Sequence, residues 1–102
     1  MIELEKYHVL IEEFCRLHNV KSLYAFGSVL TFDFKESSDI DLLVSFDSVD
    51  PADYFDNYIS LKNNLESTFH RKIDLLEEQT LKNPILIRSI NRNKKLLYGR
   101  TN

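Results

Sequence analysis

Residues 39–46 constrain the fold more than any other stretch of the sequence, because polar and apolar side chains alternate along it. Successive side chains of a β-strand point to opposite faces, so this alternation is typical of a strand with one buried face. The apolar face consists of Ile40, Leu42, Val44 and Phe46. The other face carries Asp39, Asp41, Leu43 and Ser45. The pattern predicts a strand with an apolar back and a partly acidic front.

Three other short apolar segments are also typical of strands: residues 23–26, 72–76 and 95–98. The first ends at Gly27-Ser28, and the last is followed by Gly99. We interpret the last one as an edge strand.

Helical periodicity precedes the first of these strands. Apolar residues recur there at three- and four-residue spacing, with charged residues filling the opposite side. The stripe consists of Leu4, Tyr7, Ile11 and Phe14, with Leu10 and Leu17 beside it. The pattern predicts an amphipathic helix over about residues 3–18, ending at Asn19.

The sequence predicts two further helices, which start near Asp50 and Asn83. Each of these residues is a favoured helix N-cap and is followed by a proline. The first of these helices is expected to extend to about Thr68, and the second to cover residues 85–91. The core stripe of the longer helix consists of Tyr54, Tyr58, Leu61 and Leu65.

The order of these elements predicts an α+β fold. Two consecutive strands come before the second helix, which disagrees with a strictly alternating parallel fold. We therefore expect residues 1–102 to form one domain, a small mixed β-sheet with helices packed on one face.

Composition agrees with one small domain, since 102 residues with 43% hydrophobic side chains support a single core. Cys15 is the one cysteine, and its place in a helical pattern indicates a buried thiol in a reducing compartment. The longest uninterrupted apolar stretch, residues 23–26, is too short to cross a bilayer, and the acidic N-terminus is unlike a signal peptide. We expect a cytoplasmic protein without membrane association.

Charge is distributed unevenly along the chain. Residues 33–56 are rich in carboxylates, whereas the segment from Lys82 to Arg100 contains six bases and no acid. The favoured interpretation is two solvated faces of opposite sign, and the alternative is a contact for phosphate, RNA or an acidic partner. Because the net charge is −3, a nucleic-acid partner is the weaker hypothesis.

The stretch with chemical content is Phe26-Gly27-Ser28, followed after ten residues by Asp39 and Asp41. Carboxylates at i and i+2 of a strand point the same way, about 6.5–7 Å apart along the chain. Carboxylate oxygens are ligands that Mg²⁺ prefers, and Asp74 supplies a third if its strand lies alongside. Gly27 would let the backbone approach a phosphate, and Ser28 offers a hydroxyl.

Each of these features alone has an ordinary explanation. Asp39 could cap a strand, Asp41 and Asp74 could face solvent, and Gly27-Ser28 could be a simple turn. Burying several carboxylates on one sheet face without a cation costs several kcal/mol, on the order of the penalty for unpaired buried charges. The residues alone leave a metal site and a solvated sheet about equally supported.

The same residues resemble a known signature. Gly27-Ser28, ten residues, and the segment 39–44 are similar to the motif of the DNA polymerase β superfamily of nucleotidyltransferases, in particular of its short minimal nucleotidyltransferase (MNT) members. The resemblance extends over nearly the whole chain, including Arg71 to Leu76 and the closing Leu97-Tyr98-Gly99. It implies the polymerase β-like palm fold.

The resemblance also implies an activity and its residues. Asp39 and Asp41 would ligate Mg²⁺, of which two ions are expected, and Asp74 would be a further metal ligand or the general base. Gly27 and Ser28 would bind the triphosphate of ATP or another NTP. Proteins of this class transfer a nucleoside monophosphate from an NTP to a hydroxyl, and they are often paired with HEPN-type toxins as antitoxins, in some cases by adding AMP to a tyrosine of the toxin. The implied partner is therefore a HEPN protein, and the alternative is a non-catalytic module that neutralises a partner by contact.

Two departures from the family pattern are visible. Residues 29–32 stand where many members have a basic residue and a glycine, so Lys35, Arg71 or Lys72 would have to replace a phosphate contact. The 102 residues also leave no room for an acceptor-binding domain. The three histidines form no cluster and are interpreted as structural or surface residues: His8, His18 and His70. A homo-oligomer is possible if aromatic residues prove exposed: Tyr7, Phe32, Phe34 and Tyr54.

Overall fold

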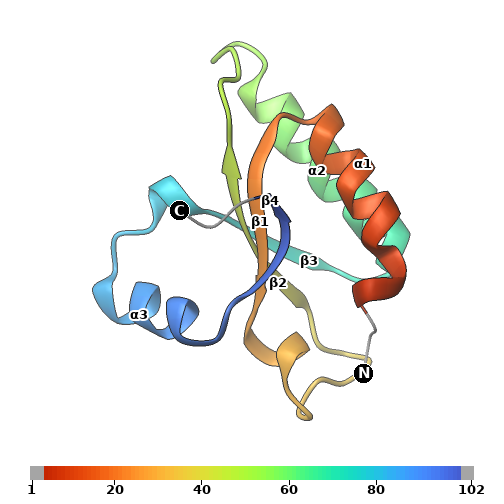
Figure 1. The fold of residues 1–102 in the computed structure, drawn as a ribbon, viewed down its shortest axis with the longest axis vertical. Coiled ribbons are helices and arrows are strands. Elements are labelled where there is room, and N and C mark those ends of the chain that lie inside the picture. The colour runs from red at the N-terminus through yellow and green to blue at the C-terminus, as the bar shows by residue number, and fades with distance from the viewer. Residues whose placement is uncertain (1–3, 100–102) are drawn as a thin grey trace.

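The computed structural model describes residues 4–99, which contain a four-stranded mixed sheet with the strand order β3-β2-β1-β4 (Figure 1). The strands are β1 (Val20–Phe26), β2 (Ile40–Phe46), β3 (Ile73–Glu77) and β4 (Lys95–Gly99). β1 pairs antiparallel with both β2 and β4, whereas β2 and β3 are parallel. The expected α+β fold, its mixed sheet and its edge strand β4 are confirmed.

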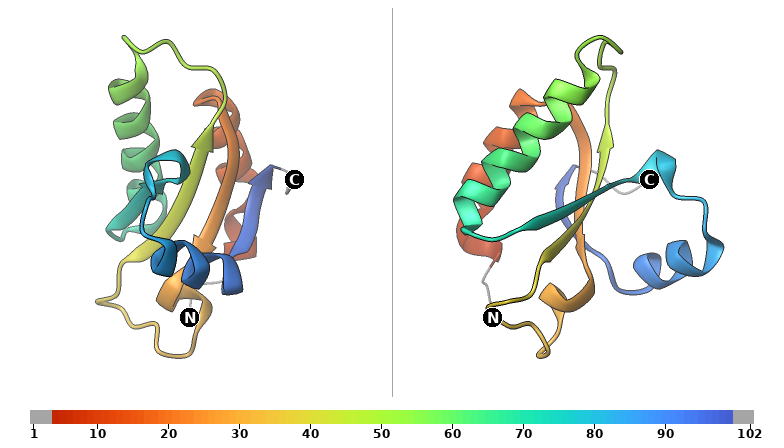
Figure 2. Two further views of the ribbon diagram at one scale, coloured as in Figure 1. Left: turned by 90° about the vertical axis from the view of Figure 1, so that its left-hand side faces the viewer. Right: turned by 180° about the vertical axis from the view of Figure 1, so that it is seen from behind.

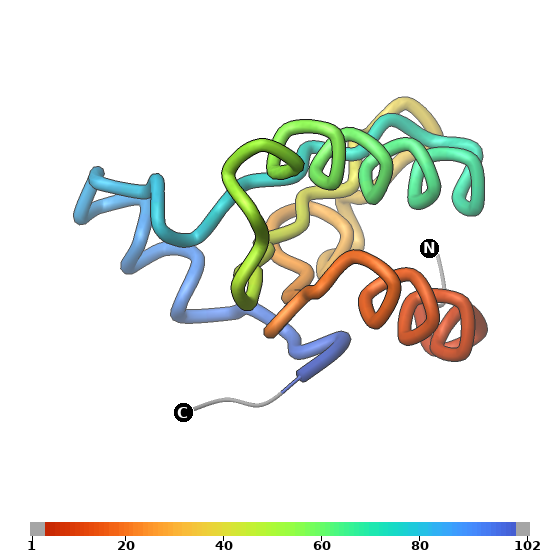
Figure 3. The backbone as a smooth tube through the Cα atoms, turned by 90° about the horizontal axis from the view of Figure 1, so that it is seen from above, coloured from red at the N-terminus to blue at the C-terminus, as the bar shows by residue number. Residues whose placement is uncertain are grey.

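Two helices cover one face of the sheet and enclose the main core. α1 (His8–Leu17) follows a short 3-10 helix, η1 (Leu4–Tyr7), and runs beside α2 (Tyr54–Phe69) when the molecule is seen from above (Figure 3). Their buried side chains meet the apolar face of β2, which alternates as the sequence predicts. The fully buried residues of this core include Ile11, Leu23, Ile40, Leu42, Val44, Leu61 and Leu65.

The third helix, α3 (Pro84–Asn93), packs against the opposite face of the sheet (Figure 1). Ile90 of α3 is buried against Tyr24 and Leu43 in a second, smaller cluster. The expectation that all helices cover one face is therefore wrong for α3. The front of β2 is acidic only at its start, since Leu43 makes its middle apolar enough to bind a helix.

Several boundaries differ from the sequence-based prediction for local reasons. β1 begins at Val20 rather than Leu23, because Asn19 adopts a positive φ of 56° and reverses the chain at once. α2 begins at Tyr54, because Asp50 accepts a hydrogen bond from the Ala52 amide and holds residues 51–53 in a turn. In the first helix, Leu10 and Leu17 are exposed.

The expected cap of α3 and the expected burial of Cys15 are confirmed. The side chain of Asn83 accepts hydrogen bonds from the amides of Ile85 and Leu86, so it caps α3 ahead of Pro84. Cys15 is fully buried, and burial, reinforced by Glu12, raises the pKa of its thiol to about 12. Within residues 4–99, none of the helices has both the length and the apolar character that crossing a bilayer requires.

Candidate active site

Asp41 and Asp74 lie side by side at the start of two paired strands. Each is the second residue of its strand, and the two are register partners across the parallel β2–β3 pair. Neighbouring strands are about 4.8 Å apart, and register partners point to the same face. Asp74 alternates with the buried Ile73 and Leu75, so both carboxylates face the α3 side of the sheet.

Gly27, directly after β1, lies next to these two carboxylates. β1 ends at Phe26, opposite Asp41, and Gly27 begins the 3-10 helix η2 (Gly27–Leu30). Gly27 has a φ of 76°, and a Cβ at this position would lie 2.5 Å from Oδ2 of Asp41. A side chain here would collide with the carboxylate and strain the backbone, so the glycine is needed for the close approach of η2 to Asp41.

Asp39 directly precedes β2, two residues before Asp41, and its charge acts on Asp41. Burial, and after it the charges of Asp74 and Asp39, raise the pKa of Asp41. Asp39 and Asp74 are exposed and Asp41 is half-buried, so solvent reaches the group from the α3 side. The structure thus brings together Gly27, Asp39, Asp41 and Asp74, as the sequence motif suggests.

The donor set suits a divalent cation in its chemistry. Among residues 4–99, however, no three His, Cys, Asp or Glu side chains are arranged so that they could already hold a metal ion. The three carboxylates nevertheless supply the oxygen ligands that Mg²⁺ prefers. The repulsion that raises the pKa of Asp41 is also what a bound cation would offset.

The loop that leads to Asp39 is held by Arg71, from the turn between α2 and β3. One guanidinium nitrogen, Nη1, donates to the carbonyl oxygens of Lys35, Glu36 and Ser38 at 2.7, 3.1 and 3.0 Å. The guanidinium also lies 4.4 Å above the ring centre of Phe34. Arg71 therefore connects the loop before Asp39 to the start of the strand that carries Asp74, and its Nη1 is engaged by the loop carbonyls.

The remaining sequence-based residues lie in varied settings. Ser28 is half-buried in η2, and its carbonyl accepts hydrogen bonds from the amide and hydroxyl of Thr31. His18 is buried and hydrogen-bonded to Ser60, as expected of a structural histidine. Of the aromatic residues considered for an oligomer contact, Phe32 is almost fully exposed, whereas Phe34 is buried.

The basic segment is partly engaged within the chain. The Lys94 ammonium lies 4.2 Å from the ring centre of Tyr24, and Lys95 pairs with Glu5. Arg100, the last base of this segment, lies outside the described residues.

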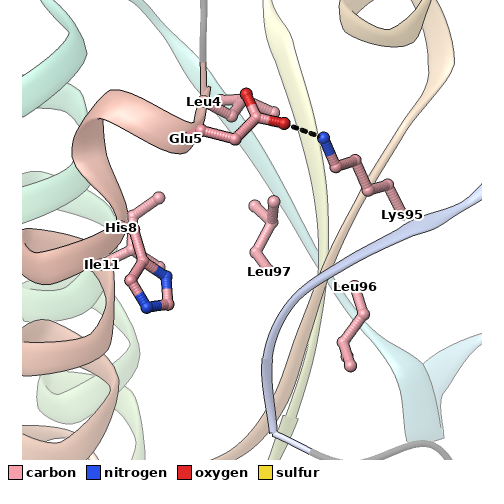
Figure 4. Close-up of a pocket in the computed structure, with 7 residues that line it drawn as sticks. All are labelled: Leu4, Glu5, His8, Ile11, Lys95, Leu96 and Leu97. Carbon is pink, nitrogen blue, oxygen red and sulfur yellow. Dashed lines mark hydrogen bonds and ion pairs between the residues drawn. The ribbon is translucent and has the colours of Figure 1, made fainter.

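Two hollows border the sheet on different sides. One, of about 570 Å³, lies between η2 and α3, and Gly27 is among its lining residues. These two elements lie near the same end of the sheet in both views of Figure 2. The other hollow, of about 330 Å³, lies between the start of α1 and β4, and the ion pair of Glu5 and Lys95 is part of its lining (Figure 4). The rest of its lining consists of Leu4, His8, Ile11, Leu96 and Leu97, so of these two hollows the first adjoins Gly27, which lies next to Asp41.

Sequence reasoning missed the loop contact made by Arg71 and the part that α3 plays in bounding the site. Arg71 was visible as a charged residue next to the third strand, but no local pattern indicates which distant carbonyls it contacts. The signal for α3 was Leu43, an apolar residue on the otherwise polar face of β2.

Comparisons with known proteins agree with this geometry. Residues 9–102 match the family described as "Polymerase beta, Nucleotidyltransferase". The chain is 35% identical to "Putative protein adenylyltransferase MJ1379" of Methanocaldococcus jannaschii over 79% of this chain and 78% of that protein.

Two solved structures share the fold. A "putative minimal nucleotidyltransferase" superposes with a TM-score of 0.74 at 27% identity, covering 92% of this chain and 95% of the other. A complex of a tri-AMPylated Shewanella oneidensis HEPN toxin with an MNT antitoxin contains a chain that matches with a TM-score of 0.65 at 22% identity, covering 96% of this chain and 74% of that one.

Proposed function

The chain belongs to the polymerase β nucleotidyltransferase family, and from that premise we propose that it transfers AMP from ATP to a hydroxyl of a partner protein. One observation carries this proposal. Asp41 is held between Gly27 and Asp74, with Asp39 nearby, and its pKa is raised by burial and by the two other carboxylates. Such a perturbed carboxylate group on an open sheet face is typical of a catalytic site.

Each residue of the group has a proposed role. Asp39, Asp41 and Asp74 would hold Mg²⁺, which when bound neutralises the charge that develops on the phosphates. Gly27 and Ser28 would bind the triphosphate beside Asp41, whose Oδ2 lies where a side chain of Gly27 would be. Asp74, the more exposed member of the strand pair, would also accept the proton of the acceptor hydroxyl.

The transfer itself is an in-line displacement at the α-phosphorus. A bond forms between the acceptor oxygen and phosphorus, the bond from phosphorus to the bridging oxygen of the β-phosphate breaks, and pyrophosphate leaves. The carboxylates need no covalent role, since positioning and charge neutralisation provide most of the catalysis in phosphoryl transfer.

We further propose that the partner is a HEPN-type toxin and that the chain is its antitoxin. The MNT antitoxin in complex with an AMPylated HEPN toxin has the same fold, and a relative at 35% identity is named as a protein adenylyltransferase. The proposal includes that the partner itself presents the acceptor hydroxyl.

The test is transfer of label from α-³²P-ATP to proteins that copurify with the tagged chain, in the presence of Mg²⁺. We expect a labelled partner and released pyrophosphate with the wild type, and neither with Asp41→Asn. Asp47→Asn is the matched control, because Asp47 lies just beyond the other end of β2 and is exposed.

Labelling that persists in Asp41→Asn would contradict the proposal. If Asp41→Asn abolishes labelling but still neutralises the partner in cells, catalysis is present without being needed for neutralisation. If the wild type neutralises the partner without labelling it, the chain is a contact-only module.

A further inference from the structure

The groove between η2 and α3 begins at the carboxylate group. Gly27 connects the groove to the carboxylate group, because it lines the groove and also lies close to Oδ2 of Asp41. Phe26, the next lining residue, is the register partner of Asp41. A molecule bound at the carboxylates therefore has a direct path into a hollow of about 570 Å³, a volume within the usual range for small-molecule sites.

The groove has apolar walls. Phe26 and Leu30 form the side that belongs to β1 and η2, while Leu86 and Ile90 form the side that belongs to α3. Among the described residues, those that line the groove include no acid and no base. The groove therefore does not suit a phosphate, and it does suit an uncharged ring with apolar faces.

The polar groups of the groove come mainly from α3. Ser89 and Asn93 are four residues apart, so they occupy the same side of the helix, one turn from each other. Thr31, across from them, is already engaged, because its hydroxyl donates to the Ser28 carbonyl and accepts from the Asp33 amide. The carboxamide of Asn93 offers a donor and an acceptor side by side, which is the pattern that pairs with the N6 and N7 edge of adenine.

We propose that this groove binds the nucleobase of the NTP, with Asn93 and Ser89 as its specificity-determining residues. The inference rests on the proposed nucleotidyltransferase activity and adds to it a base-binding subsite on α3. The triphosphate stays with Gly27, Ser28 and the carboxylates, while the uncharged base enters the uncharged groove. Asn93 then favours adenine over guanine, whose corresponding edge carries two acceptors.

The test separates binding of the base from binding of the phosphates. Calorimetric titrations with ATP, GTP and inorganic tripolyphosphate, each with Mg²⁺, are compared for the wild type and Asn93→Ala. We expect Asn93→Ala to weaken ATP binding about tenfold, to remove the preference for ATP over GTP, and to leave the tripolyphosphate affinity unchanged.

A matched control and a second variant complete the design. Asn91→Ala removes the same side chain two positions earlier in α3, where Asn91 lines a different hollow beside Leu43, and it should bind ATP like the wild type. Ser89→Leu should fill the groove and weaken ATP binding without changing tripolyphosphate binding. Ser89, Asn91 and Asn93 are all exposed on α3, so the three variants are expected to fold.

Three results would overturn the inference. If Asn93→Ala and Ser89→Leu keep the ATP affinity of the wild type, the base does not lie in the groove. If they keep it but slow transfer to the partner, the groove binds the acceptor instead. If the wild type binds neither ATP nor tripolyphosphate, the nucleotide site itself is wrong, and the proposed function fails together with this inference. If only the groove inference fails, the wild type still binds ATP and tripolyphosphate, and Asp41→Asn loses both.

Discussion

On one face of the sheet, α1 and α2 cover a continuous apolar core, whereas α3 lies on the opposite face and packs there on a smaller cluster (Figure 2). Asp39 and Asp74 remain exposed on that side. The covered face contains fully buried residues such as Leu61 and Leu65. The open face contains Asp41, whose pKa is raised by burial and by its charged neighbours. The face under α1 and α2 therefore contributes most of the buried core, whereas the face under α3 holds carboxylates that repel one another.

Truncation of the core tests this division most strongly. Leu65→Ala on the covered face should lower the free energy of unfolding by about 3 kcal/mol, because Leu65 is fully buried and the cavity would be enclosed. Ile90→Ala on the α3 side should cost less, about 2 kcal/mol, since the smaller cluster around Tyr24 and Leu43 can relax into the adjoining groove. Urea denaturation of both variants measures the difference, and a larger loss for Ile90→Ala would contradict the comparison.

Gly27→Ala should reduce stability and nucleotide binding together. A side chain at a positive φ costs about 1–2 kcal/mol, and the new Cβ would displace the Asp41 carboxylate. Gly99→Ala is the matched control, because Gly99 also has a positive φ and its new Cβ would meet the backbone of Lys21, away from the carboxylates. The control should lose stability while the folded fraction binds Mg-ATP like the wild type. Unchanged ATP binding by Gly27→Ala would refute the role given to this close approach.

Arg71→Met should have a smaller effect that falls mainly on the site. The variant loses three hydrogen bonds to the loop and the contact with Phe34, which together are expected to contribute about 1 kcal/mol at this partly exposed position. Without these contacts, Asp39 is positioned less well, so ATP binding should become more dependent on Mg²⁺ concentration. Arg71→Lys should restore part of the affinity, and Lys72→Met should change neither property. Full Mg-ATP affinity in Arg71→Met would show that the loop needs no such support.

The smallest expected effect is the pH dependence of stability. A carboxyl group whose folded-state pKa is raised destabilises the fold when ionised, and this penalty disappears as the pH falls below its unfolded-state value of about 3.9. Asp41→Asn should therefore be more stable than the wild type at pH 7, and the difference should shrink toward pH 4. Urea denaturation across this range measures it, with Asp47→Asn as the control that shows no such trend. A wild type that is more stable than Asp41→Asn at pH 7 would contradict this prediction.

Local patterns predicted most of what is local in this fold. The alternation in residues 39–46 predicted β2 and its two faces, and Asn83 with its following proline predicted the start of α3. The closeness of Asp39 and Asp41 was predictable, because the two residues are only two positions apart in the chain. Their meeting with Asp74 depended on β3 pairing in register with β2, which the sequence only suggested.

Long-range packing could not be predicted in the same way. The sequence of α3 does not indicate which face of the sheet it will cover, and only the buried pair of Tyr24 and Leu43 decides it. The three carbonyls that Arg71 contacts lie more than thirty positions away in the chain, and no periodicity indicates such a contact. The groove beside the carboxylates follows from the placement of α3, so it too was hidden from sequence reasoning.

The most direct test of the account is a calorimetric titration of ATP into the wild type and Asp41→Asn, each with Mg²⁺ and with EDTA. ATP binding by the wild type should require Mg²⁺, and Asp41→Asn should bind ATP about tenfold or more weakly, because Asp41 is at the centre of the carboxylate group. Equal affinity of the two proteins, or ATP binding by the wild type that persists unchanged in EDTA, would contradict it.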